Sequence, residues 1–224
     1  MRILMCILVL IGAFCASSAN AEFKGHLSLG PNPKDETGAT KVLLSDFGYI
    51  DPNGLGWEAS KGDITDGASI PKIFHPLIGD NWTFEYLKAA IIHDHYCVRE
   101  ARSWRQTNRV FFDILIESGV DRIRSAAMYY AVLVGSHKWK QPAPGINCKI
   151  TKNCIKTVGG ETLISRPPVY DDPKIAADVQ NFHASIEANP SALSAEEIEA
   201  LAAQRNPGDV FLNGGSGAGG LPTK

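Results

Sequence analysis

Three amphipathic segments follow one another between residues 83 and 138, and they limit the possible folds more than any other feature of the chain. They run over residues 83–101, 104–119 and 121–138, and in each of them apolar residues recur three and four positions apart, as on one helix face. The connections are a few residues long, so successive helices must run antiparallel and pack together. We therefore predict an antiparallel three-helix core.

Strand signals precede the helices. Val42–Leu44 and Phe47–Ile50 are strand-like, and Asp51–Gly54 has the composition of a tight turn, which together predict a hairpin over residues 42–57. Residues 22–41 are polar and contain Gly and Pro, so we expect a loosely held lead-in. The expected fold class is α+β and mainly helical, with one or more N-terminal β-hairpins packed on the three-helix core.

The first 21 residues have the pattern of a secretory signal peptide. A positive start at Arg2 precedes an apolar run over residues 3–14 and small residues that end in Ala19-Asn-Ala21. The apolar run is shorter than the roughly 20 residues that a membrane-spanning helix needs. We expect cleavage after Ala21, a periplasmic or secreted protein, and no transmembrane segment in the mature chain.

Four segments are expected along the chain: a signal peptide over residues 1–21, an α+β core domain over 22–139 that contains the candidate site, an extension over 140–212, and a disordered tail over 213–224. The extension begins with a linker and a small loop, in which Cys148 and Cys154 are expected to pair in an oxidising compartment. Two helices follow, over residues 172–188 and 194–204, and the second opens with a capping-box sequence.

Two short motifs in the core domain carry residues suited to chemistry. The segment Thr65–Pro71 puts the Asp66 carboxylate on a sharp corner, and His93 and Asp94 are neighbours in the first helix. Adjacent helical residues point about 100° apart, so this histidine and aspartate serve different tasks. If the corner folds over the helix, Asp66 and Gly67 join Asp94 as oxygen ligands of a hard cation such as calcium. His93 is then free to act as a general base on water.

Three polar side chains lie on the apolar faces of the three predicted helices. They are His93, Asn108 and His137. An unpaired polar group on such a face is costly, and the packed helices bring these faces together, so the three residues are candidates for one catalytic group. His95 and Asp113 fall off the apolar faces, and we expect both in solvent.

Each candidate also has a structural interpretation. Asp66 can simply cap the turn at Gly67, and His93 can be a core histidine whose ring nitrogens are satisfied internally. Cys97, among apolar residues of the first helix, is expected to be a small buried hydrophobe. The sequence leaves a catalytic site and a structural hydrogen-bond network both open.

Three motifs, taken in order, resemble the domain-of-unknown-function family 1353 of bacteria and phages. They are the segments Thr65–Pro71, Ala89–Asp94 and Gly135–Trp139. The resemblance covers about residues 40–139 and implies no activity. The family usually has an aromatic residue where this chain has Cys97, and an aspartate where it has Asn108.

A more distant resemblance, to secreted phospholipases A2, implies a chemistry. It makes His93 the base and Asp94 a calcium ligand, and it puts Asp66 and Gly67 in a calcium loop. Asn108 takes the place of the carboxylate that orients the histidine. Asparagine can hold the ring, but it cannot stabilise the imidazolium as a carboxylate does.

Three hypotheses about function follow. The first is a secreted, calcium-dependent hydrolase that acts on lipid or other esters with a histidine general base. The second is a non-enzymatic envelope or secreted binding module, in which the inward polar residues are structural. The third is a cell-wall hydrolase, suggested only by the occurrence of the family in phages. The expected partner is a lipid or another envelope component, and the net charge of −2 gives no overall attraction to nucleic acid.

Overall fold

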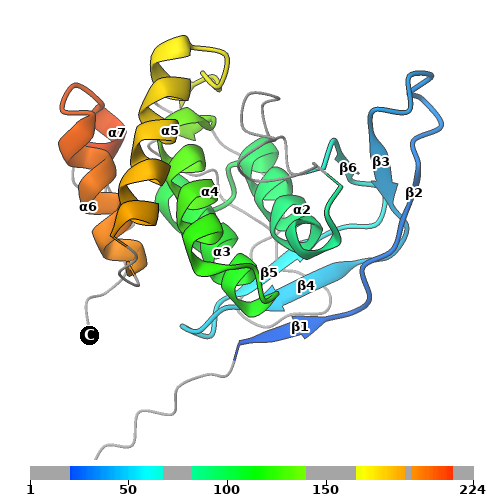
Figure 1. Ribbon diagram of the computed structural model, residues 1–224. Helices are drawn as coiled ribbons and strands as arrows, with labels where there is room; N and C mark the ends of the chain where they lie inside the picture. The colour runs from blue at the N-terminus through cyan, green and yellow to red at the C-terminus, as the bar shows by residue number, and fades with distance from the viewer. Residues whose placement is uncertain (1–20, 68–81, 140–164, 190–192, 214–224) are drawn as a thin grey trace, which may run out of the picture.

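The computed structural model describes residues 21–67, 82–139, 165–189 and 193–213 (Figure 1). Antiparallel strands precede a helical region in these ranges, which confirms the α+β class. The strands are β1 (Glu22–Lys24), β2 (Leu29–Pro31), β3 (Lys41–Leu43), β4 (Phe47–Ile50), β5 (Gly56–Ala59), β6 (Ile64–Thr65), β7 (Lys138–Trp139) and β8 (Ser165–Arg166). The helices are α2 (Phe84–Arg99), α3 (Trp104–Glu117), α4 (Arg122–Gly135), α5 (Pro173–Ala188), α6 (Ala195–Arg205) and α7 (Val210–Asn213).

Local hydrogen bonds determine where the central helices begin. The Ser103 hydroxyl accepts a bond from the backbone N–H of Gln106 and caps α3. The Asp121 carboxylate accepts bonds from two backbone N–H groups, those of Ile123 and Arg124, and caps α4. These caps lie where the sequence predicts helix starts. The helices then pack in chain order, α2 on α3 and α3 on α4, with β4 and β5 beneath them (Figure 1).

The predicted hairpin is present in part. Its turn joins β4 to β5, and the Asp51 carboxylate accepts the backbone N–H groups of Asn53 and Leu55 there. Strand β3 pairs instead with β2 and β6 in a second sheet. The expectation of a loose lead-in over residues 22–41 was wrong, because β1 pairs with β4 and β2 with β3. These pairings use backbone groups, which leave little pattern in the sequence.

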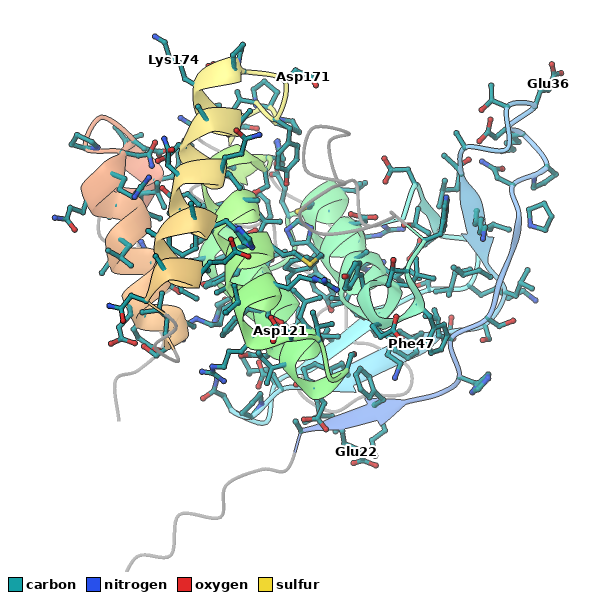
Figure 2. The ribbon with its side chains drawn as sticks, viewed as in Figure 1. Glu22, Glu36, Phe47, Asp121, Asp171 and Lys174 are labelled. Atoms are coloured by element: carbon teal, nitrogen blue, oxygen red, sulfur yellow. The ribbon has the colours of Figure 1, made fainter. Side chains whose placement is uncertain are left out.

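The extension packs on the far side of α4. Helices α5 and α6 begin and end close to the predicted positions, and the capping box between Ser194 and Glu197 is present. Both helices contact α4, while charged side chains such as Glu36 and Lys174 project outward at the periphery (Figure 2). Within the described ranges, no helix is long and apolar enough to cross a membrane. The predicted signal peptide over residues 1–21, apart from Ala21, the predicted tail beyond residue 213 and the expected pairing of Cys148 with Cys154 lie outside those ranges.

Asp113 is half-buried, although we expected it in solvent. Burial raises its pKa from 3.8 to about 7, and the nearby Arg109 only partly opposes this. Between these two pH values the folded chain holds a proton that the unfolded chain has lost, so stability falls as pH rises. We expect the melting temperature of Asp113→Asn to rise relative to that of wild type as the pH is increased from about 4 to 7. A difference that does not change with pH would contradict this.

Candidate active site

Helix α2 lies between α3 and β6 (Figure 1) and presents His93 and Asp94 to different neighbours. The His93 ring is only 7% exposed and packs against Phe111 of α3, with 5.2 Å between ring centroids. Its Nε2 lies 2.9 Å from Oδ1 of Asn108, which is fully buried. The structure thus brings together two of the three residues on the apolar faces, and a hydrogen bond joins them.

The neighbours of Asn108 determine which ring nitrogen of His93 carries the proton. The Asn108 Nδ2 group donates to the backbone carbonyl of Trp104 at 3.0 Å, so its Oδ1 must be the atom that faces the histidine. Ser136 also donates to this oxygen, at 3.5 Å. Since Oδ1 can only accept, His93 donates from Nε2–H, and its Nδ1 is left with a lone pair when the ring is neutral.

Cys97 is the neighbour of His93 that the sequence interpretation missed as a site residue. It lies one helical turn later and is a free, partly exposed cysteine, with Sγ 3.7 Å from Nδ1 and 3.5 Å from Nε2 of His93. Burial tends to lower the pKa of His93, but Cys97 and Asp94 outweigh it and raise this pKa well above its usual value. The i, i+4 spacing of the two residues was the signal that could have identified the contact.

The Asp66 corner folds onto α2, as the calcium hypothesis requires. The Thr65 hydroxyl donates to Oδ2 of Asp94 at 2.9 Å and accepts the backbone N–H of Gly67 at 3.1 Å. Gly67 has a φ of +86°, a conformation that favours glycine. Burial raises the pKa of Asp94, and the negative charge of Asp66 adds to that effect, although His93 opposes it. The predicted metal residues are therefore neighbours, while residues 68–71 of this motif lie outside the described ranges.

His137 occupies a different place from the one that its helical spacing predicted. Helix α4 ends at Gly135, so His137 lies on the extended segment that leads into β7. Its Nε2 lies 2.7 Å from Oε1 of Glu100, and its ring stacks on Trp139. His137 thus lies between the C-terminal end of α2 and strands β7 and β8, and Ser136 rather than His137 bonds to Asn108.

The extension contributes Tyr170 to the surroundings of this site. Its ring packs so closely on Gly135 that a Cβ atom there would lie 2.4 Å from a ring carbon. Burial raises the pKa of Tyr170 well above its usual value, and the nearby Cys97 and Asp94 raise this pKa further. The phenol therefore stays protonated at neutral pH and remains a hydrogen-bond donor.

A cavity of about 290 Å³ lies on the β6 side of α2, and Asp94 is part of its wall. A partly buried polar cluster forms another part of the wall: Asp63 bonds to His95 Nδ1 and accepts a 2.7 Å bond from Arg99. Burial opposes ionisation of Asp63, but His95 and Arg99 keep its pKa below the usual value. The expectation that His95 is exposed was wrong, because the segment that carries Asp63 covers this face of the helix.

Comparison with known proteins gives one family and two relatives. The chain matches the family described as "Protein of unknown function (DUF1353)" over residues 41–132. It is similar to "Uncharacterized protein y4iH" of Sinorhizobium fredii, at 36% identity over 199 residues that cover 87% of this chain and 82% of the relative. It is also 34% identical over 194 residues to "Uncharacterized protein y4jT" of the same organism, with 79% of this chain and 56% of the relative covered. No solved structure matches the chain.

Proposed function

The chain belongs to the DUF1353 family, as its motifs predicted, and we propose that it is a hydrolase of lipid or other esters with His93 as its general base. The bond from His93 Nε2 to Asn108 Oδ1 carries this proposal. It holds the ring in one orientation and one tautomer, and it leaves Nδ1 available to take a proton from a nucleophile.

The roles of the neighbouring residues follow from this geometry. His93 removes a proton from the nucleophile, which is water in the simplest case, and later returns a proton to the departing alkoxide. Asn108 is neutral, so it positions the ring but adds no charge beside it. The Asp94 carboxylate lies 3.9 Å from Nδ1, so it can offset the positive charge that the imidazole acquires.

Calcium is the cofactor that we propose, because the available donors are oxygen atoms. Asp94 and Asp66 would supply carboxylates and Gly67 a carbonyl, as hard cations prefer. Within the described ranges no three His, Cys, Asp or Glu side chains form a metal-binding group, and the proposed coordination therefore includes backbone oxygens. A bound cation would offset the like charges that raise the pKa of Asp94, and it would polarise the ester carbonyl.

A metal titration of the full-length chain tests the calcium site. We expect calcium to raise the melting temperature by several degrees, because a ligand at about 100 times its Kd stabilises the folded state by about 2.7 kcal/mol. Magnesium should have less effect, and Asp94→Asn should abolish the rise. Glu85→Gln removes an exposed carboxylate from the same helix and should keep it. No rise in wild type, with hydrolysis unaffected by chelator, would overturn the calcium role alone.

The predicted signal peptide guides the choice of substrates. The signal-peptide pattern over residues 1–21 supports a periplasmic or secreted location, where lipids and other envelope esters are available. Short-chain p-nitrophenyl esters and phosphatidylcholine vesicles are the substrates to test. Hydrolysis that requires His93 supports the proposed function, and the absence of any hydrolysis contradicts it.

A binding module is the second candidate function, and the burial of His93 at 7% exposure favours it. In that case the bond to Asn108 only satisfies two buried polar groups. The two functions differ in what His93→Gln does: it abolishes hydrolysis in an enzyme, whereas in a binding module it changes only stability.

A further inference from the structure

We propose that Cys97 is the nucleophile of this hydrolase and forms a thioester with the acyl group of the substrate. This inference rests on the proposed function and deepens it, since it replaces direct attack by water with acyl transfer in two steps. Three side chains carry it: the Cys97 sulfur, the His93 ring beside it, and the Asn108 amide behind the ring.

The contacts have the order that nucleophilic catalysis needs. A nucleophile must reach a base, and a third group must orient that base. Cys97 Sγ lies 3.7 Å from His93 Nδ1, the nitrogen with the free lone pair, and Nε2 is held by Asn108 at 2.9 Å. The sulfur is almost equally far from both nitrogens, so it lies against the ring. Asn108 and Phe111 hold the ring in place, and the proposed proton transfer requires the Cys97 side chain to turn toward Nδ1.

The exposure of the three residues increases from Asn108 through His93 to Cys97. Asn108 is fully buried and His93 is 7% exposed, whereas Cys97 is partly exposed. In the proposed reaction the substrate approaches from the Cys97 side of the ring. A thiol is also intrinsically more nucleophilic than water, and only its thiolate form attacks.

Asn108 is compatible with a thiol nucleophile. A neutral amide cannot stabilise the imidazolium by charge, and the Asp94 carboxylate, 3.9 Å from Nδ1, supplies one negative charge beside the ring. When Cys97 gives its proton to Nδ1, the thiolate becomes a second negative group there.

The reaction balances without any further reagent. The thiol proton moves to His93 Nδ1, the thiolate attacks the ester carbonyl, and a C–S bond replaces the C–O bond while His93 gives its proton to the leaving alkoxide. Water then attacks the thioester and loses a proton to His93. The C–S bond breaks, the carboxylic acid leaves, and the sulfur regains a proton.

Mass spectrometry of the full-length chain after a brief reaction with p-nitrophenyl butyrate tests the proposal. We expect the butyryl group on the peptide that contains Cys97 in wild type, and none there in His93→Gln. Cys97→Ala and Cys97→Ser should both lower turnover at least about 100-fold, and the serine variant keeps the size of the side chain. Melting temperatures verify that the variants are folded.

Alkylation by iodoacetamide gives a readout that needs no turnover. The reference is a thiol one position further along α2, made by Val98→Cys in a Cys97→Ala chain, because Val98 is 79% exposed. At neutral pH we expect Cys97 in wild type to react at least about 10-fold faster than this reference, and to lose the advantage in His93→Gln. Wild type that fails to hydrolyse esters, yet shows this fast reaction and the adduct, supports the nucleophile and contradicts the hydrolase.

Two outcomes overturn the inference. If Cys97→Ala keeps most of its activity while His93→Gln loses it, water is the nucleophile and the proposed hydrolase stands. If no ester is hydrolysed and Cys97 reacts no faster than the reference thiol, both the nucleophile and the hydrolase are wrong.

Discussion

Replacing His93 by glutamine should lower the rate of ester hydrolysis by about 10²–10⁴-fold, which is the usual contribution of a general base. Glutamine can still form a hydrogen bond with Asn108, so the fold should persist while the base is lost. The measurement is the steady-state rate on p-nitrophenyl esters, together with the melting temperature of each variant. A loss of kcat with little change in KM is expected, because His93 acts on the reacting atoms.

A matched control for this variant is His183→Gln. His183 is another buried histidine, 7% exposed, but it lies on α5, where it faces Glu187. We expect this variant to retain wild-type hydrolysis. A large and equal loss in both variants would point to destabilisation and would contradict the role of His93.

A further variant, His137→Gln, tests whether His137 belongs to the catalytic group. If it does, this variant should lose activity as His93→Gln does.

Removing the Glu199 carboxylate should destabilise the protein by about 2–4 kcal/mol. Glu199 of α6 is 9% exposed and accepts bonds from Arg105, Arg109 and Tyr129, at 2.6–2.8 Å for the closest contact of each. Glu199→Ala removes the acceptor of these hydrogen bonds, so the two arginines of α3 and the tyrosine of α4 lose a partner. The two arginines are partly exposed, which keeps the expected cost below that of a fully buried pair. Denaturant unfolding measures the change in free energy.

Glu196→Ala provides the control on the same helix. Glu196 also pairs with Arg109, but its side chain is 71% exposed. An exposed ion pair contributes about 0–1 kcal/mol, so we expect a small effect. Equal effects of the two substitutions would show that burial of Glu199 does not anchor the extension to the core.

Much of the helical region could be predicted because its signals are local. Ser103 and Asp121 cap their helices through bonds to residues two or three positions away. Helical periodicity put His93 and Asn108 on faces that must meet when short connections join the helices. Their hydrogen bond could therefore be expected before any tertiary structure was known.

His137 and His95 show why the rest of the site could not be predicted. Periodicity continued through His137, but α4 ends at Gly135, where the backbone carbonyl accepts a bond from the N–H of Val169 and Tyr170 packs closely. That contact comes from a segment more than thirty residues away. His95 is buried for the same kind of reason, since the partner that covers it, Asp63, belongs to the strand region.

The sequence by itself determined the class of the fold, the three central helices, the caps of α3 and α4, and the pairing of His93 with Asn108, because each depends on spacing within a helix or between neighbouring helices. Only the tertiary structure decided the two sheets, the end of α4, and the contacts of Cys97, Thr65 and Tyr170 around the site. Strand pairing and side-chain contacts between distant segments depend on backbone hydrogen bonds and shape, and neither leaves a periodic signal in the chain.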